Sequence, residues 1–557
     1  MGNNKAFSTL VLILFIFGLP ACNTPILAST PVPTSTTTKP TAAPSKTAIV
    51  LPNSLVQPTS TATGGSSPDI LWNDALGKPI VIEGFKGLWS PVADELAGIL
   101  QFEIGDCCGD TGTLGISSQP GFTYIALDED NKQKVVESLN WSPDGQKILY
   151  GIAVTSGGLG DMSYSNPWII DRNGENSRII IESTFQALEF SGWLDTARAV
   201  FVGYAGGQGR KVAVWNIATG QLEYDEVVES FDFFPFHNNM IPATYGSATN
   251  QIYVITPGKI NSDPSMLFQP LQSTHIFPYE KGIYPYSGGA FFQDWQPGVN
   301  VMLVIYQGWL NEKEQVDVSD LLLWNLDTDQ VSTLIPGGLS GHFTPDGRNL
   351  VYVTAGPYSQ FEPSMSGTDA LTQVDLETQP FLQVMDFPNR QVWLSLPIIA
   401  ERYTWLYPDG VTEAINLSLS PDSRYMTFMT QGKPSLDGNG LPGEVTFIDT
   451  KKSYFNILDM WTKQLIYSEP LDIKLDLDKI IWSPSSKYFV YQGVENNWQL
   501  FNVENGDALV LTFKGNTMVG SPAWSYDGRY LSFIRDEKTG QWPYATYILN
   551  MANLPNK

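Results

Sequence analysis

Cysteine, histidine and charge are all scarce in this chain. It has 3 Cys and 3 His among 557 residues, and charged residues make up only 16%. A disulfide-stabilised scaffold or a zinc module needs Cys or His at short, regular spacing, which is absent here. Gly-x-Ser-x-Gly elbows, Walker loops, dinucleotide fingerprints and Cys-x-x-Cys pairs are absent as well. The sequence therefore predicts no catalytic residue, no cofactor and no His- or Cys-based metal site.

Positive charge is also in short supply. Lys and Arg total 32 against 57 Asp and Glu, which gives a formal net charge of −25. Such a surface would repel the phosphates of a nucleic acid, so we expect no nucleic-acid binding. Docking on anionic lipid through a basic patch is disfavoured for the same reason. We interpret the excess as a solubilising acidic surface, with steering by an acidic site as the alternative.

Long apolar runs are missing except at the N-terminus. Lys5 precedes an apolar segment, residues 6–19, that is too short to span a bilayer, and Leu-Pro-Ala then precedes Cys22. This pattern resembles a bacterial lipobox. The resemblance implies a lipoprotein signal peptide over residues 1–21, acylation of Cys22 and an extracytoplasmic chain that is lipid-anchored to the cell membrane. Ordinary secretion with cleavage nearby is the alternative.

Thr, Ser and Pro dominate the segment that follows, residues 22–68. It lacks the apolar content needed to form a core, so we expect a disordered, extended tether. A folded domain over residues 69–557 would then be held clear of the membrane.

The stretch "SLNWSPDGQKILYGIA", residues 138–153, shows what that domain is made of. Pro143 presets φ for a turn, Asp144 suits its second corner and Gly145 accepts the positive φ that closes it. Apolar residues alternate on both sides, as one buried face of a strand requires. The unit is a tight β-hairpin with an aromatic residue at its mouth.

The same hairpin recurs along the chain, with a second hairpin after most copies. Further copies start near 341, 417, 480 and 522, and weaker ones near 87, 191, 242 and 293. Four antiparallel strands in each period of roughly 40–50 residues are typical of a propeller blade. We predict an all-β chain with a single β-propeller of about eight four-stranded blades, seven to nine being possible. Residues 78–84 are predicted to complete the last blade as its outer strand.

Tandem Trp-Ser-Pro-Asp-Gly hairpins followed by Ile-x-Tyr/Phe resemble the WD-like repeats of TolB-type β-propellers. The best copies cover residues 141–145 and 343–347, and the resemblance extends over nearly all of 70–550. It implies a periplasmic or cell-surface binding scaffold, and the repeat occurs in both binding proteins and hydrolases.

Long loops follow the second strand of several blades, at the end opposite the tight turns. They cover 105–121, 155–167, 307–319, 355–369, 431–443 and 536–543. Insertions on one face of a repeat protein mark a binding face. Candidate binding-face aromatics in these loops are Tyr164, Trp309, Tyr358, Phe361 and Trp542. They could instead fold back as local hydrophobic plugs.

Two further groups in these loops are chemically distinctive. Cys107 and Cys108 are adjacent, and the sequence leaves open whether they form a strained vicinal disulfide or remain thiols. Asp437, Asn439 and Glu444 form a weak calcium candidate that fails to match the full EF-type pattern.

Two functional classes follow from these features. The first, which we favour, is a monomeric scaffold that binds a protein, peptide or glycan at the bacterial cell envelope. The second is an envelope enzyme, a glycoside hydrolase, lyase or quinoprotein-like protein, with its site in the central funnel. Chain spacing cannot reveal a carboxylate pair in a radial fold.

Overall fold

The chain divides into two units, residues 1–66 and 67–557, and everything described below lies in the second. The computed structural model describes residues 79–103, 111–118, 123–126, 135–154, 164–181, 188–204, 210–228, 235–238, 240–245, 251–255, 289–310, 315–328, 330–354, 381–397, 417–435, 446–471, 480–492, 498–511, 521–536 and 544–554.

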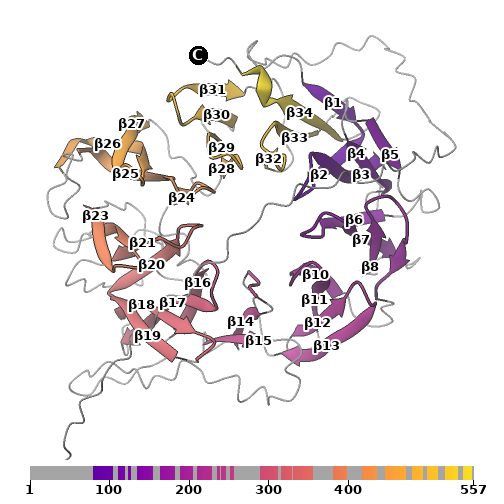
Figure 1. Cartoon of the computed structure of the whole chain (residues 1–557), viewed down its shortest axis with the longest axis horizontal. Coiled ribbons are helices and arrows are strands. Elements are labelled where there is room, and N and C mark those ends of the chain that lie inside the picture. The colour runs from indigo at the N-terminus through magenta and orange to yellow at the C-terminus, as the bar shows by residue number, and fades with distance from the viewer. Residues whose placement is uncertain are drawn as a thin grey trace, which may run out of the picture. The chain divides into compact units, whose positions relative to one another are not determined.

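The described residues form nine antiparallel sheets, here called blades A to I, of which eight have four strands and blade D has two (Figure 1). Blade A contains β2 (Phe85–Trp89), β3 (Glu95–Glu103), β4 (Thr111–Ser118) and β5 (Thr123–Ala126). Blade B contains β6 (Val135–Trp141), β7 (Lys147–Val154), β8 (Tyr164–Asp171) and β9 (Arg178–Ile179). Blade C contains β10 (Leu188–Trp193), β11 (Arg198–Tyr204), β12 (Arg210–Asn216) and β13 (Gln221–Val228). Blade D contains β14 (Ile241–Tyr245) and β15 (Gln251–Ile255). Blade E contains β16 (Gly289–Trp295), β17 (Val301–Leu310), β18 (Gln315–Asn325) and β19 (Gln330–Pro336). Blade F contains β20 (Gly338–Phe343), β21 (Asn349–Thr354), β22 (Phe381–Asp386) and β23 (Gln391–Pro397).

The remaining blades follow the same plan, and the last one borrows a strand from the start of the domain. Blade G contains β24 (Leu417–Leu419), β25 (Tyr425–Ser435), β26 (Thr446–Asp459) and β27 (Gln464–Leu471). Blade H contains β28 (Ile481–Trp482), β29 (Tyr488–Gln492), β30 (Trp498–Asn502) and β31 (Ala508–Leu511). Blade I contains β32 (Ala523–Trp524), β33 (Tyr530–Asp536), β34 (Tyr544–Asn550) and β1 (Ile80–Glu83). A short 3-10 helix, η9 (Met551–Asn553), follows β34. No helix among the described residues is long and apolar enough to cross a membrane.

Each tight turn is held by the side chains that recur in the sequence. Ser142 Oγ donates to Asp144 Oδ1 at 2.6 Å and accepts from the Lys147 amide at 2.9 Å. Gly145 has φ of 63°, the left-handed conformation that its position in the turn requires. Ser420 with Asp422 and Ser525 with Asp527 repeat the Ser-to-Asp bond at 2.7 and 3.1 Å. The repeated polar residues therefore stabilise the hairpins.

The repeated tryptophans join one blade to the preceding one. Trp141 Nε1 in blade B donates to the Leu88 carbonyl in blade A at 3.0 Å. Trp89 Nε1 in blade A donates to the Ala523 carbonyl in blade I at 3.1 Å. The second of these bonds connects the first blade to the last.

Apolar side chains fill the space between every pair of consecutive blades. Ile99 of blade A shares a buried cluster with Ile148 of blade B, and Val353 of blade F shares one with Phe428 of blade G. A corresponding cluster at the seam joins Phe85 of blade A to Ile548 of blade I. Each blade therefore packs on the next and the last packs on the first. The fold is a β-propeller, as the repeat predicts.

Strand β1 closes the last blade. It pairs antiparallel with β34, with Ile80 opposite Ile548 and Glu83 opposite Ala545 (Figure 1, where the indigo β1 lies beside the yellow β34). This confirms the outer strand predicted from residues 78–84.

The blade count also agrees with the repeat, within the range predicted. Eight blades have four strands, and the weakest copy, at 242–255, forms blade D with two described strands. Blade D has its own apolar contacts with blades C and E, through Ile241 and Val254 respectively. It therefore counts as a ninth blade.

Five of the predicted loops are partly wrong. Residues 111–118 form β4, and residues 307–310, 315–319 and 431–435 lie in β17, β18 and β25. Tyr164 begins β8, and Asp536 ends β33. The hairpin ladders continue beyond the length that the apolar alternation indicates. Backbone hydrogen bonding along a hairpin does not require buried side chains, so the polar sequence gave no sign of the extension.

Candidate functional site

Most of the predicted site residues lie outside the described residues. They are Cys22, Cys107, Cys108, Tyr358, Phe361, Trp542, Asp437, Asn439 and Glu444. No group of three or more metal-ligating side chains occurs among the described residues.

The other two predicted residues are on strands. Tyr164 is paired with Val154 at the start of β8, and Trp309 is paired with Val316 near the end of β17. Both belong to hairpins at the end of their blades opposite the tight turns, although not to the loops in which they were expected.

The two described histidines contact neighbouring elements. His237 stacks on Trp295 with ring centroids 4.6 Å apart, and its Nε2 lies 3.0 Å from the Val299 carbonyl. His342 Nδ1 lies 3.8 Å from Asp294. That carboxylate also accepts from the Phe343 amide at 2.9 Å, which links blades E and F. These contacts favour a structural role for both rings.

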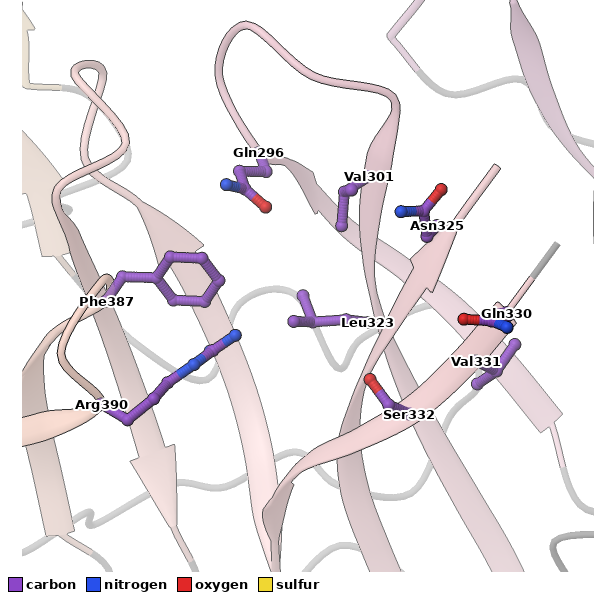
Figure 2. A pocket seen from close by; sticks show the side chains of 9 residues that line it. All are labelled: Gln296, Val301, Leu323, Asn325, Gln330, Val331, Ser332, Phe387 and Arg390. Carbon is purple, nitrogen blue, oxygen red and sulfur yellow. The ribbon is translucent and has the colours of Figure 1, made fainter. Parts of the chain in front are cut away.

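An open crevice of about 520 Å³ lies between blades E and F. Figure 2 shows the side chains that line it. One wall comes from blade E and the other from the turn between β22 and β23 of blade F. The lining residues are Gln296, Val301, Leu323, Asn325, Gln330, Val331, Ser332, Phe387 and Arg390. Because Gln296 and Arg390 belong to tight turns, the crevice lies at the end of the blades opposite the predicted binding face.

Arg390 supplies the positive charge of this crevice. Its guanidinium lies 3.9 Å from the centroid of the Phe387 ring, a cation–π contact, and Figure 2 shows the side chain pointing into the crevice. Partial burial lowers the pKa of Arg390, but a guanidinium remains charged at physiological pH. The structure gives Arg390 no ion pair with any described residue. Its charge is therefore available to a ligand.

Neutral polar side chains surround this charge. Asn325 Oδ1 accepts from the amides of Asp327 and Thr328 at 3.0 and 3.1 Å, which leaves its Nδ2 as a donor. Gln296, Gln330 and Ser332 also line the crevice, and their side chains make no hydrogen bond to any described residue. The floor is apolar, because Leu323 and Phe387 are buried there. The crevice thus combines one cation, several neutral hydrogen-bonding groups and an apolar floor.

A second crevice of about 520 Å³ lies at the corresponding position between blades G and H. Its cation is Arg424, which donates to Asp459 Oδ2 through Nε at 3.0 Å and Nη2 at 2.9 Å. This hydrogen-bonded ion pair raises the pKa of Arg424. The Arg424 charge is already neutralised by Asp459, so it is less available to an anionic ligand than the charge of Arg390.

The sequence matches no protein-family model, and no curated protein matches it either. Solved structures with a similar fold include an oligogalacturonate lyase in complex with manganese, with 12% identity, a TM-score of 0.34 and coverage of 84% of this chain and 98% of that chain. Another is the C-terminal WD40 domain of Sif2, with 9% identity, a TM-score of 0.37 and coverage of 85% and 97%. A third is the Cps50 (Swd1) β-propeller domain of Myceliophteria thermophila, with 11% identity, a TM-score of 0.30 and coverage of 86% and 99%. Because the TM-scores are below 0.5, these likenesses say nothing about the activity of this chain.

Sequence reasoning missed the crevice between blades E and F. Its walls lie far apart in the chain, since Gln296 and Arg390 are separated by most of two blades. A sequence signal did exist: the turn that ends at Arg390 aligns with turns that end at Gly220 and Gly506. Blade F has Arg at the position where blades C and H have Gly, and a non-Gly residue at such a position is a sign of a functional role.

Proposed function

We propose that this chain is a lipid-anchored, extracytoplasmic β-propeller that acts as a binding scaffold for a protein, peptide or glycan at the bacterial cell envelope. The single observation that supports binding most directly is the crevice between blades E and F, where Arg390 and several polar side chains make no ion pair or hydrogen bond with any described residue. Binding a ligand there would order these side chains but not the backbone that carries them, which limits the entropy lost.

Rigidity follows from the way the blades are joined. Apolar clusters fill the junctions between consecutive blades, and indole hydrogen bonds cross several of them. A scaffold of this kind presents its loops and crevices in fixed relative positions, which favours recognition of an extended ligand. The TolB-type resemblance of the repeats supports the same role.

The anchor is supported by the N-terminal sequence, in which Leu-Pro-Ala precedes Cys22. Radiolabelled fatty acid should be incorporated into the wild-type chain and not into Cys22→Ala. Release of both proteins into the medium in equal amounts would leave ordinary secretion as the explanation.

Binding is tested by pull-down from envelope extract with the wild-type chain. A double variant, Trp309→Ala with Tyr358→Ala, removes two large aromatics from the predicted long-loop face, and Arg390→Gly removes the cation of the crevice at the opposite end of the blades. We expect at least one of these variants to lose partners that the wild type retains. Identical partners for all three proteins would place the binding surface elsewhere on the propeller.

A further inference from the structure

The turn between the third and fourth strands is similar in several blades. Four residues separate these strands in blades C, F and G and five in blade H, and the fourth residue after the third strand has positive φ in each. Those residues are Gly220, Arg390, Lys463 and Gly506, with φ of 72°, 56°, 57° and 75°. Glycine adopts this conformation without steric penalty, whereas Arg and Lys do not. Blades F and G therefore keep a long cationic side chain at a position that favours Gly.

The cation of blade G is used within the protein. Lys463 Nζ lies 5.0 Å from the ring centroid of Trp393, which is the third residue of the outer strand of blade F. Where blade C has Gly220, the cation comes from the preceding blade instead. There Arg178 packs against the glycine and donates to the Ile217 carbonyl. Both of these junctions are closed by a cation and its partner.

The junction between blades E and F is different. In blade F, Trp393 lies in a β-bulge between Val392 and Leu394, which pair with Met385 and Val384. The outer strand of blade E has no bulge at this point, since Ser332 pairs regularly with Leu323. That strand, β19, contains no aromatic residue that could cover the cation, and the small Ser332 side chain lines the crevice. Arg390 rests on Phe387 of its own turn, and the space left over is the crevice.

We propose that the crevice between blades E and F binds an acidic glycan, with the Arg390 guanidinium receiving the ligand's oxyanion. This inference rests on the proposed scaffold function and assigns it a ligand class. A guanidinium fork matches the geometry of carboxylate, sulfate or phosphate. The Asn325, Gln330 and Ser332 side chains are suited to hydrogen-bond the hydroxyl groups of a sugar.

An acidic peptide fits the same site less well. It would bring a charge at almost every residue, with the charges on one face of an extended chain about 7 Å apart, toward a crevice with one available cation. The protein as a whole has 57 acidic against 32 basic side chains, so additional anionic charge would be repelled. One cation among several neutral donors matches a ligand with one charge among several hydroxyls.

The test measures binding of the full-length chain, in detergent, to four polymers: dextran, carboxymethyl dextran, dextran sulfate and poly-L-glutamate. Salt of about 0.15 M limits the reach of the overall negative charge to about 8 Å. We expect binding to one or both acidic dextrans and none to neutral dextran. Carboxymethyl dextran and dextran sulfate distinguish a carboxylate from a sulfate as the recognised group.

Two substitutions test the crevice itself. Arg390→Gly installs the residue that blades C and H have at this position, so the variant should fold at least as well as the wild type. It should weaken binding to the acidic dextran by about 10-fold or more, as expected for loss of a charge-assisted hydrogen-bond pair. Ser332→Trp keeps the cation and fills the crevice with a large side chain, so it should also weaken binding. Lys463→Gly is the matched control, because it removes a cation at the equivalent position outside the crevice, and it should bind like the wild type.

Equal binding by Arg390→Gly and the wild type would overturn the inference, as would equal losses for Arg390→Gly and Lys463→Gly. Binding to poly-L-glutamate alone would mean that the ligand is a peptide. If the wild-type chain and Arg390→Gly capture the same envelope partner and neither binds an acidic dextran, the scaffold function stands and the glycan assignment fails.

Discussion

The indole nitrogens of the repeated tryptophans differ in whether they have a hydrogen-bond acceptor. Trp141 Nε1 donates to the Leu88 carbonyl of the preceding blade at 3.0 Å. Trp193 occupies the same place in blade C, and its buried Nε1 has no acceptor among the described residues. A buried donor without an acceptor costs free energy relative to one that is paired. The two residues are therefore a matched pair for measuring what the indole bond contributes.

We predict that Trp141→Phe destabilises the protein by about 1 kcal/mol more than Trp193→Phe. Both substitutions remove the same atoms, but the indole N–H is paired in Trp141 and unpaired in Trp193, and Trp141 is the more buried of the two. The difference therefore reports the paired donor together with this greater burial. Unfolding in urea, followed by tryptophan-independent circular dichroism, measures both losses. Equal losses would show that the bond between blades A and B adds no net stability.

Asp320 is a buried carboxyl group in blade E. Its side chain is 2% exposed. Oδ1 accepts from the Gly337 amide at 2.8 Å, and Oδ2 has no partner among the described residues. Burial raises the pKa of Asp320, and the Gly337 hydrogen bond opposes that rise only in part. Folding therefore favours the protonated acid. The stability that this group contributes is present below the ordinary carboxyl pKa and is lost as pH rises through the raised value.

We predict that Asp320→Asn has a higher Tm than the wild type near neutral pH, on the order of 1 °C. The gain should shrink as the pH falls, because the wild-type carboxyl then takes up its proton. Differential scanning calorimetry between about pH 8 and about pH 5 measures the trend. The exposed Asp327→Asn serves as the control and should show no such pH dependence. A gain that is independent of pH would mean that charge burial is not its cause.

Strand β1 is the element that completes the propeller from the other end of the domain. Side chains alternate along it, so Ile82 is 5% exposed and packs with Phe85 and Ile548, whereas Val81 is 42% exposed. Without β1, strand β34 would be a free edge, and exposed edges invite pairing with other chains. The seam should therefore govern both stability and aggregation.

We predict that Ile82→Ala lowers the free energy of unfolding by about 2–5 kcal/mol, since it leaves a cavity at the seam. Val81→Ala, one residue earlier on the exposed face, should cost less than about 0.5 kcal/mol. Chemical denaturation measures both. Hydrogen exchange of the β34 amides should also accelerate in Ile82→Ala alone. Comparable effects of the two variants would contradict the pairing of β1 with β34.

Net charge acts on the whole molecule. A formal charge of −25 on one chain produces self-repulsion, which opposes the compact state. The surface ion pairs, such as Lys487 with Glu504 at 3.3 Å, are exposed and contribute little to compensate. Screening by salt should therefore favour folding.

We predict that raising NaCl from about 10 mM to about 200 mM at neutral pH increases Tm by a few degrees, because the screening length falls from about 30 Å to under 8 Å. KCl should act identically. CaCl2 at matched ionic strength separates screening from specific binding. An additional rise with Ca²⁺ that Asp437→Asn removes would identify the calcium candidate as a site. A fall in Tm with NaCl would show that ion pairs outweigh self-repulsion.

The sequence by itself determined the fold class, the approximate blade number and the closing strand. These follow from local chemistry: Pro, Asp and Gly shape each turn, alternating apolar residues define each strand, and repetition converts one hairpin into a propeller. Strand β4 and the extension of β17, β18 and β25 were missed, because backbone pairing continues where the side chains give little apolar signal.

Only the tertiary structure decided where the crevice between blades E and F lies. Gln296 and Arg390 are distant in the chain and meet because blade F packs on blade E. Whether the cation in the turn between the third and fourth strands is covered depends on the outer strand of the preceding blade, which supplies Trp393 in blade F and no aromatic residue in blade E. A local pattern specifies a turn, but it does not specify what the neighbouring blade places against it. The physical reason is that side-chain contacts between blades are set by packing in space, not by spacing along the chain.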